Sequence, residues 1–92
     1  MPRIRTIKPQ FWFDEDLGSI AREARLLYIG LWNLSDDQGV FEWRPQQIKA
    51  QLFPYDADIQ NGTIDGWLGD LTKVGNLVRF SHNGKNYGYI PT

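Results

Sequence analysis

The stretch Trp67–Tyr89, WLGDLTKVGNLVRFSHNGKNYGY, decides the fold. Its apolar residues up to Val74 recur at helical spacing, and Gly75 follows at the position where a left-handed C-cap is favourable. Asn83-Gly84 then supplies the two positive φ angles of a type I′ turn, which predicts a tight β-hairpin around it. A helix that leads directly into a hairpin is typical of the second half of a winged helix.

The two-residue turn sets the register of this hairpin. The expected pairs are Val78 with Tyr89, Arg79 with Gly88, Phe80 with Tyr87, and His82 with Lys85. Because paired residues share a face, we expect the valine and the three aromatic residues to face the core and Arg79 to face away from it. Leu77 and Ile90, at the base of the hairpin, are expected to be covered by the helices or by the amino-terminal segment.

Upstream of this stretch, the apolar pattern predicts a first helix from Ser19 to about Ser35, with Ser19 as its N-cap. The turn-forming sequence DDQG, residues 36–39, ends it. Residues 40–43, VFEW, are β-prone and predict a short edge strand that pairs with the hairpin.

Two further helices are expected before the hairpin. Pro45 can begin the second helix, because its missing amide costs nothing at the first helical position, and Pro54 ends it. The third helix is expected to begin between Gln60 and Thr63. Its inward residues would be Ile64, Trp67, Leu68, Leu71 and Val74.

The predicted fold class is therefore α+β: a winged helix-turn-helix of three helices and a small antiparallel sheet, at residues 19–92. Residues 1–18 are expected to form an extended, basic arm with a short turn that packs aromatic residues on the core. The chain has 92 residues, enough for one domain with one core, and no cysteine, which excludes a disulfide scaffold or a thiolate metal site. No apolar run reaches the roughly 20 residues that a membrane span requires, and the amino terminus lacks the apolar region of a secretory signal.

Net charge is −1, so any affinity for nucleic acid must come from a local basic surface. The arm, the second helix and the hairpin carry most of the candidate DNA-binding residues. They are Arg3, Arg5, Lys8, Arg44, Gln46, Gln47, Lys49, Lys73, Arg79, His82 and Lys85. The third helix is a difficulty for this hypothesis, because Asp65 and Asp70 are expected on its outward face and carboxylates repel phosphates.

The sequence contains no nucleophile–base pair, no phosphate-binding glycine loop and no metal-ligand spacing, so we expect neither an enzyme nor a cofactor. His82, the sole histidine, is interpreted as an exposed cross-strand partner. The carboxylates at residues 14–16 precede a predicted helix, which favours interaction with the helix dipole or simple solvation over metal binding.

Five segments of the chain resemble a known family. They are MPRIRTIKPQFW (residues 1–12), ARLLYIGLWNLSDDQGVF (24–41), IKAQLFPYD (48–56), WLGDLTKVGNLVRF (67–80) and YGYIP (87–91). Together they are similar to the N-terminal winged-helix domain of phage and prophage replication proteins of the replisome-organiser or DnaD-like type. The resemblance implies a phage-encoded DNA-binding or replication-initiation module in the cytoplasm of a bacterial host cell. The glycines at 62, 66 and 69 depart from the helix-favouring residues expected there, which puts a groove-reading role for that helix in doubt.

Two functions follow from these observations. The first is non-catalytic binding of double-stranded DNA in phage DNA replication initiation or its regulation. The alternative is a protein–protein interaction module, a winged helix that forms a homodimer or higher oligomer or binds other replication proteins as part of a replisome scaffold. The aromatic residues of the arm favour this alternative.

Overall fold

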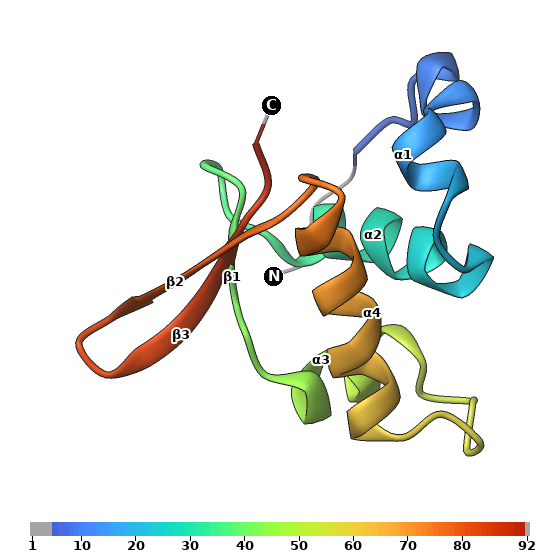
Figure 1. Ribbon diagram of the computed structural model, residues 1–92. Helices are drawn as coiled ribbons and strands as arrows, with labels where there is room; N and C mark the ends of the chain where they lie inside the picture. Colours follow the sequence, from blue (N-terminus) through green and yellow to red (C-terminus); the bar gives the residue numbers. More distant parts are fainter. Residues whose placement is uncertain (1–4, 92) are drawn as a thin grey trace.

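The computed structural model describes residues 5–91, which form an α+β domain of helices and a three-stranded antiparallel sheet (Figure 1). The elements follow in the order η1 (Pro9–Phe13), α1 (Glu15–Gly18), α2 (Arg22–Leu34), β1 (Val40–Glu42), α3 (Pro45–Leu52), α4 (Asn61–Lys73), β2 (Val78–His82) and β3 (Lys85–Tyr89). The helices predicted at the second and third places are confirmed, with Pro45 at the start of α3 and Asn61 at the start of α4.

The amino-terminal segment differs from the predicted extended arm. Residues Pro9–Phe13 form a 3-10 helix and Glu15–Gly18 a short α-helix, whose Phe11 and Leu17 are buried in the core. The Asp14 side chain caps α1 by accepting hydrogen bonds from the backbone amides of residues 16 and 17, so this carboxylate serves the helix terminus.

Helix α2 begins later than predicted. Its N-cap is Ala21, and no side chain caps it, so the expectation that Ser19 is the N-cap is wrong. The Ser19 hydroxyl instead donates to the backbone oxygen of Asp16, at the end of α1. Ser19 is the C-cap of the short helix α1, and α2 starts at Arg22.

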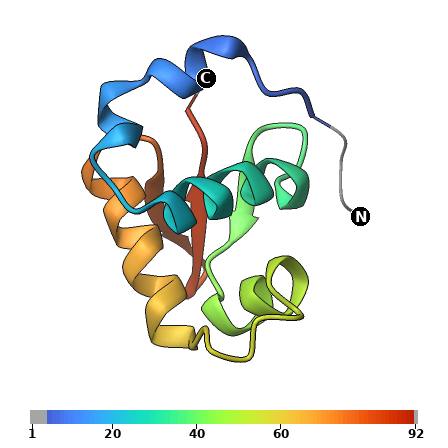
Figure 2. The ribbon, with the colours of Figure 1, turned by 90° about the vertical axis from the view of Figure 1, so that its right-hand side faces the viewer.

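The core lies among α2, α4 and the base of the sheet. Leu27 and Leu31 of α2 and Leu68 and Leu71 of α4 are fully buried there, on the apolar faces of two helices that pack together. Figure 2 shows α2 crossing in front of the sheet, with α4 beside it. Gly30 of α2 permits a close approach of α3, because a Cβ there would lie 2.6 Å from a methyl carbon of Leu52.

The sheet has the order β1-β3-β2, so β1 is an edge strand as predicted. The register of β2 and β3 is the one that the turn predicts, and Asn83 and Gly84 have φ angles of 52° and 77°. Gly75, with φ 86°, follows the end of α4, and Asn76 donates to the oxygen of Leu71 there. Local turn chemistry thus sets the path of the chain from α4 into the hairpin.

The orientation of the hairpin is the reverse of the expectation. Gly88 is buried against the ring of Phe41, so the face that carries Gly88 and Arg79 is the inner one. Val78, Phe80 and Tyr89 are on the outer face and are 47%, 39% and 37% exposed. The prediction that these side chains face the core is therefore wrong: a glycine leaves room for the Phe41 ring, and the larger side chains lie on the side away from it.

Candidate nucleic-acid interface

Trp43 lies between β1 and α3 and contacts residues of both β1 and β3. Its ring is buried and near-parallel to that of Phe41, with the ring centroids 6.1 Å apart. Its backbone amide donates to the oxygen of Asn86, 3.0 Å away, which extends the pairing of β1 with β3 by one bond. Trp43 therefore joins the short edge strand, the hairpin and the start of α3.

Two charged side chains from other elements meet this tryptophan. The guanidinium carbon of Arg79 lies 4.8 Å from the ring centroid of Trp43, in cation–π geometry. The indole N–H of Trp43 donates to a carboxylate oxygen of Asp65 at 3.3 Å, which ties the first half of α4 to the same place. This contact satisfies the indole and occupies one oxygen of a carboxylate that otherwise faces solvent.

Next to Trp43 lies a cleft of about 250 Å³, here named the Trp43 cleft. Arg44, the N-cap residue of α3, and Lys85, the first residue of β3, both line it. Glu42 also lines it and lies 3.6 Å from the Arg44 side chain, in an exposed ion pair that contributes little to stability. The cleft and the Arg79 side chain beside it thus combine three cations with the carboxylates of Glu42 and Asp65.

The remaining candidate residues of the helices and the hairpin do not line this cleft. Gln46 and Gln47 are exposed in the first turn of α3, and His82 is exposed opposite Lys85 on the hairpin. Lys49 is half-buried on α3. Lys73 is exposed in the last turn of α4, about 12 Å along the helix axis from Asp65.

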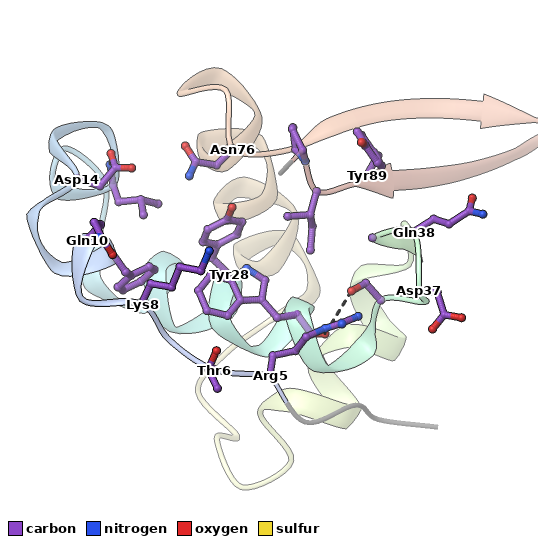
Figure 3. A pocket seen from close by; sticks show the side chains of 17 residues that line it. Arg5, Thr6, Lys8, Gln10, Asp14, Tyr28, Asp37, Gln38, Asn76 and Tyr89 are labelled. Carbon is purple, nitrogen blue, oxygen red and sulfur yellow. Dashed lines mark hydrogen bonds between the residues drawn. The ribbon is translucent and has the colours of Figure 1, made fainter.

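The arm residues lie at a different place. Figure 3 shows the Arg5 side chain beside the carboxyl end of α2. Arg5 donates from Nε to the backbone oxygen of Trp32 and from a terminal nitrogen to that of Asp36, both at 3.1 Å. A cation at the carboxyl end of α2 complements the helix dipole, and these two hydrogen bonds to backbone carbonyls hold the arm to the domain. Lys8 is exposed, and Arg3 lies outside the described residues.

Arg5 and Lys8 line a second cleft, of about 690 Å³, between the arm and α2. Tyr28, Trp32 and Ile90 are among the apolar residues that line it. Figures 1 and 2 place the arm beside α2, away from the tip of the hairpin. The structure therefore brings the cations of α3 and of the hairpin together and does not bring Arg5 and Lys8 to them.

The exposed face of α4 has few side chains other than carboxylates. Asp65, Gly66, Gly69 and Asp70 are exposed, as the sequence predicts. Thr72 is half-buried, and its hydroxyl donates to the oxygen of Leu68, four residues before it in the same helix.

The DNA-binding candidates drawn from the sequence include neither Trp43 nor Asp65, although both belong to this site. Their signal is weak: Trp43 stands two residues after Phe41, at the spacing that places both on one face of a strand, and it immediately precedes Arg44. The contact of Trp43 with Asp65 spans 22 residues, so nothing local predicts it.

The described residues contain neither a metal-binding cluster nor a membrane-spanning helix. Between residues 5 and 91, no three acidic or histidine side chains come close enough to hold a metal ion. The helices in that same part of the chain are all too short or too polar to cross a membrane. Comparisons with models of protein families, with curated proteins and with solved structures found no match.

Proposed function

We propose that this domain is a winged helix that binds double-stranded DNA without catalysing a reaction. In this assignment α2, α3 and α4 are the three helices, β1 is the short strand between the first two, and the β2–β3 hairpin is the wing. The order of elements supports it, because a winged helix places its third helix and its wing on a common side toward the duplex.

The observation that carries the proposal is the convergence of three cations at Trp43. Arg44 and Lys85 line one cleft although they are 41 residues apart, and Arg79 lies over the adjoining ring. Arginine and lysine side chains at such a place bind backbone phosphates, which positions a protein on DNA independently of sequence. Of the described arm residues, Arg5 and Lys8 do not take part in this surface.

Helix α4 contributes little to reading base sequence. Gly62, Gly66 and Gly69 lie on one face at spacings of four and three residues, and a Cβ added at any of them would meet nothing within 4 Å. A helix with this face has few side chains that reach base edges, and its Asp65 and Asp70 are acidic. We therefore expect phosphate contacts to dominate and sequence preference to be weak.

The biological setting follows from the resemblance to phage and prophage replication proteins of the replisome-organiser or DnaD-like type. We propose that the domain acts in the initiation of phage DNA replication or in its regulation, in the cytoplasm of a bacterial host cell. The resemblance supports this setting, and the cation cluster supports the contact with DNA.

Fluorescence anisotropy with a labelled duplex across a salt series tests this function. The double variant Arg44→Ala/Lys85→Ala is expected to bind more weakly at low salt, with a log–log salt slope about two units shallower, since each lost phosphate contact removes about 0.9. Lys8→Ala is the matched control, because it removes an exposed cation from the arm and should leave the slope unchanged. An unchanged slope in the double variant, or no binding by the wild type, would refute duplex binding at the Trp43 cleft.

A second function, protein–protein interaction, is favoured by two side chains of η1. Trp12 and Phe13 are 62% and 83% exposed, unlike their neighbour Phe11, which is buried. Exposed aromatic residues are enriched at protein interfaces. Sedimentation of the wild type and of Trp12→Ala/Phe13→Ala tests this alternative: an oligomer that the double variant dissociates, without any affinity for duplex DNA, would favour a scaffold over a DNA-binding domain.

A further inference from the structure

The outer face of the sheet carries three rings that the proposed function does not use: Phe80 and Tyr89 are exposed, and Tyr87 is half-buried. Phe80 and Tyr87 face each other across β2 and β3, with near-parallel rings whose centroids are 5.5 Å apart. Tyr89 lies two residues further along β3 and is opposite Val78 on one side and Val40 on the other. We call these five residues the aromatic face.

A lysine and a histidine border the aromatic face at the tip of the hairpin. His82 and Lys85 are paired with each other, and strand alternation places them on the same side as Phe80 and Tyr87. Glu42 lies opposite Tyr87, and its charge is balanced by the Arg44 side chain 3.6 Å away. The face therefore joins exposed rings to positive charge, without an unopposed carboxylate among these residues.

We propose that the aromatic face binds single-stranded DNA by stacking unpaired bases on Phe80, Tyr87 and Tyr89, with Lys85 on a phosphate. Rings beside a cation are the arrangement that single-strand binding uses, because every base has a π-face and every nucleotide has a charge. We name DNA rather than RNA because the proposed function places DNA beside the same hairpin. Only this choice between DNA and RNA rests on the proposed function.

The size of the face fits bases better than a second copy of this chain. An aromatic side chain has roughly 150–250 Å² of surface, so the exposed fractions of Phe80 and Tyr89 amount to roughly 150 Å². Val78 and the half-buried Val40 and Tyr87 bring the whole aromatic face to roughly 300 Å². A stable interface between two proteins requires about 800 Å² from each partner. The aromatic face alone falls far below that area, and it is large enough for two or three bases.

The test is anisotropy of a labelled oligo(dT) with the full 92-residue chain and its variants. Phe80→Leu/Tyr87→Leu keeps apolar side chains but removes both stacking surfaces, and we expect it to weaken oligo(dT) binding at least about tenfold. Phe80→Tyr/Tyr87→Phe keeps both rings and should bind like the wild type, while Val78→Ala controls for lost apolar area on the same face. In the wild type, ring-proton resonances of Phe80 and Tyr87 should move upfield on addition of oligo(dT).

Three results would overturn the proposal. They are equal oligo(dT) affinity of the wild type and the leucine double variant, no oligo(dT) binding by the wild type, and a wild-type dimer that the leucine double variant dissociates without a change in oligo(dT) affinity. A duplex measured in parallel separates this site from the proposed function. Ring-dependent binding of oligo(dT) without duplex binding would refute only the proposed function, and duplex binding with ring-independent or absent oligo(dT) binding would refute only the aromatic face.

Discussion

The two faces of the β2–β3 hairpin differ in what they contact. On the inner face, Gly88 lies against the ring of Phe41, and Arg79 lies over Trp43. On the outer face, Phe80 is paired with Tyr87 and remains 39% exposed. The face with the larger side chains is thus the one that the core does not use.

This difference shows what strand alternation can and cannot decide. Alternation divides the hairpin into two sets of side chains, and it does so from the turn alone. Which set faces inward depends on the shape of the neighbouring surface. Here the Phe41 ring projects toward β3, and only a residue without a side chain fits beneath it.

The largest expected contrast is between two phenylalanines, one on each side of the sheet. Phe41→Ala should lower the free energy of unfolding by about 3–5 kcal/mol, because it empties a buried site. Phe80→Ala should lower it by about 1 kcal/mol, since the ring is partly in solvent already. Urea denaturation measures both values, and Phe41→Leu provides a milder change if the alanine variant does not fold. A greater cost at Phe80 than at Phe41 would mean that the hairpin is turned the other way.

Gly88→Ala tests the close contact directly. The new methyl group would overlap the Phe41 ring, so the free energy of unfolding should fall by about 1–3 kcal/mol. Gly66→Ala is the control, because its Cβ meets nothing and alanine favours the helix by up to about 1 kcal/mol. Equal stability of Gly88→Ala and the wild type in denaturant titrations would contradict the assigned packing.

The features that could be predicted from the sequence are those that depend on contacts between residues close together in the chain. The hairpin register, the C-cap at Gly75 and the turn at Gly84 could be predicted, because each depends on neighbours within a few residues. The role of Arg5 could not, since its hydrogen bonds reach carbonyls 27 and 31 residues away. In the candidate site, the sequence predicts that basic residues of α3 and of the hairpin bind DNA. It does not predict that they lie together, because Arg79 and Asp65 meet only through their contacts with the buried Trp43.

Arg5 of the arm also differs from the cations at Trp43, because we expect it to contribute to stability and not to DNA binding. Arg5→Ala removes two hydrogen bonds from a charged donor to backbone carbonyls, and we expect a loss of about 1 kcal/mol in the free energy of unfolding. Affinity for duplex DNA at low salt should stay as in the wild type. Lys8→Ala, without such contacts, should change stability by less than about 0.5 kcal/mol. A stable Arg5→Ala protein with weakened duplex binding would return the arm to the DNA-binding surface.

The smallest expected effect concerns the Trp43 ring. Trp43→Phe removes the hydrogen bond to Asp65 and weakens the contact with Arg79, so we expect a loss of about 0.5–1 kcal/mol. Thermal unfolding followed by circular dichroism is sufficient to detect it. Trp12→Phe, at a largely exposed position, serves as the control and should leave the melting temperature unchanged.

The central claim is that Trp43 and the cations around it meet the duplex and the rings of the aromatic face do not. An NMR titration of the protein with a fully paired duplex tests it most directly, with the Trp43 indole N–H and the ring protons of Phe80 and Tyr87 observed together. The account predicts that the indole resonance moves with duplex concentration while the ring protons stay in place. Movement of the ring protons with an unmoved indole resonance would contradict it.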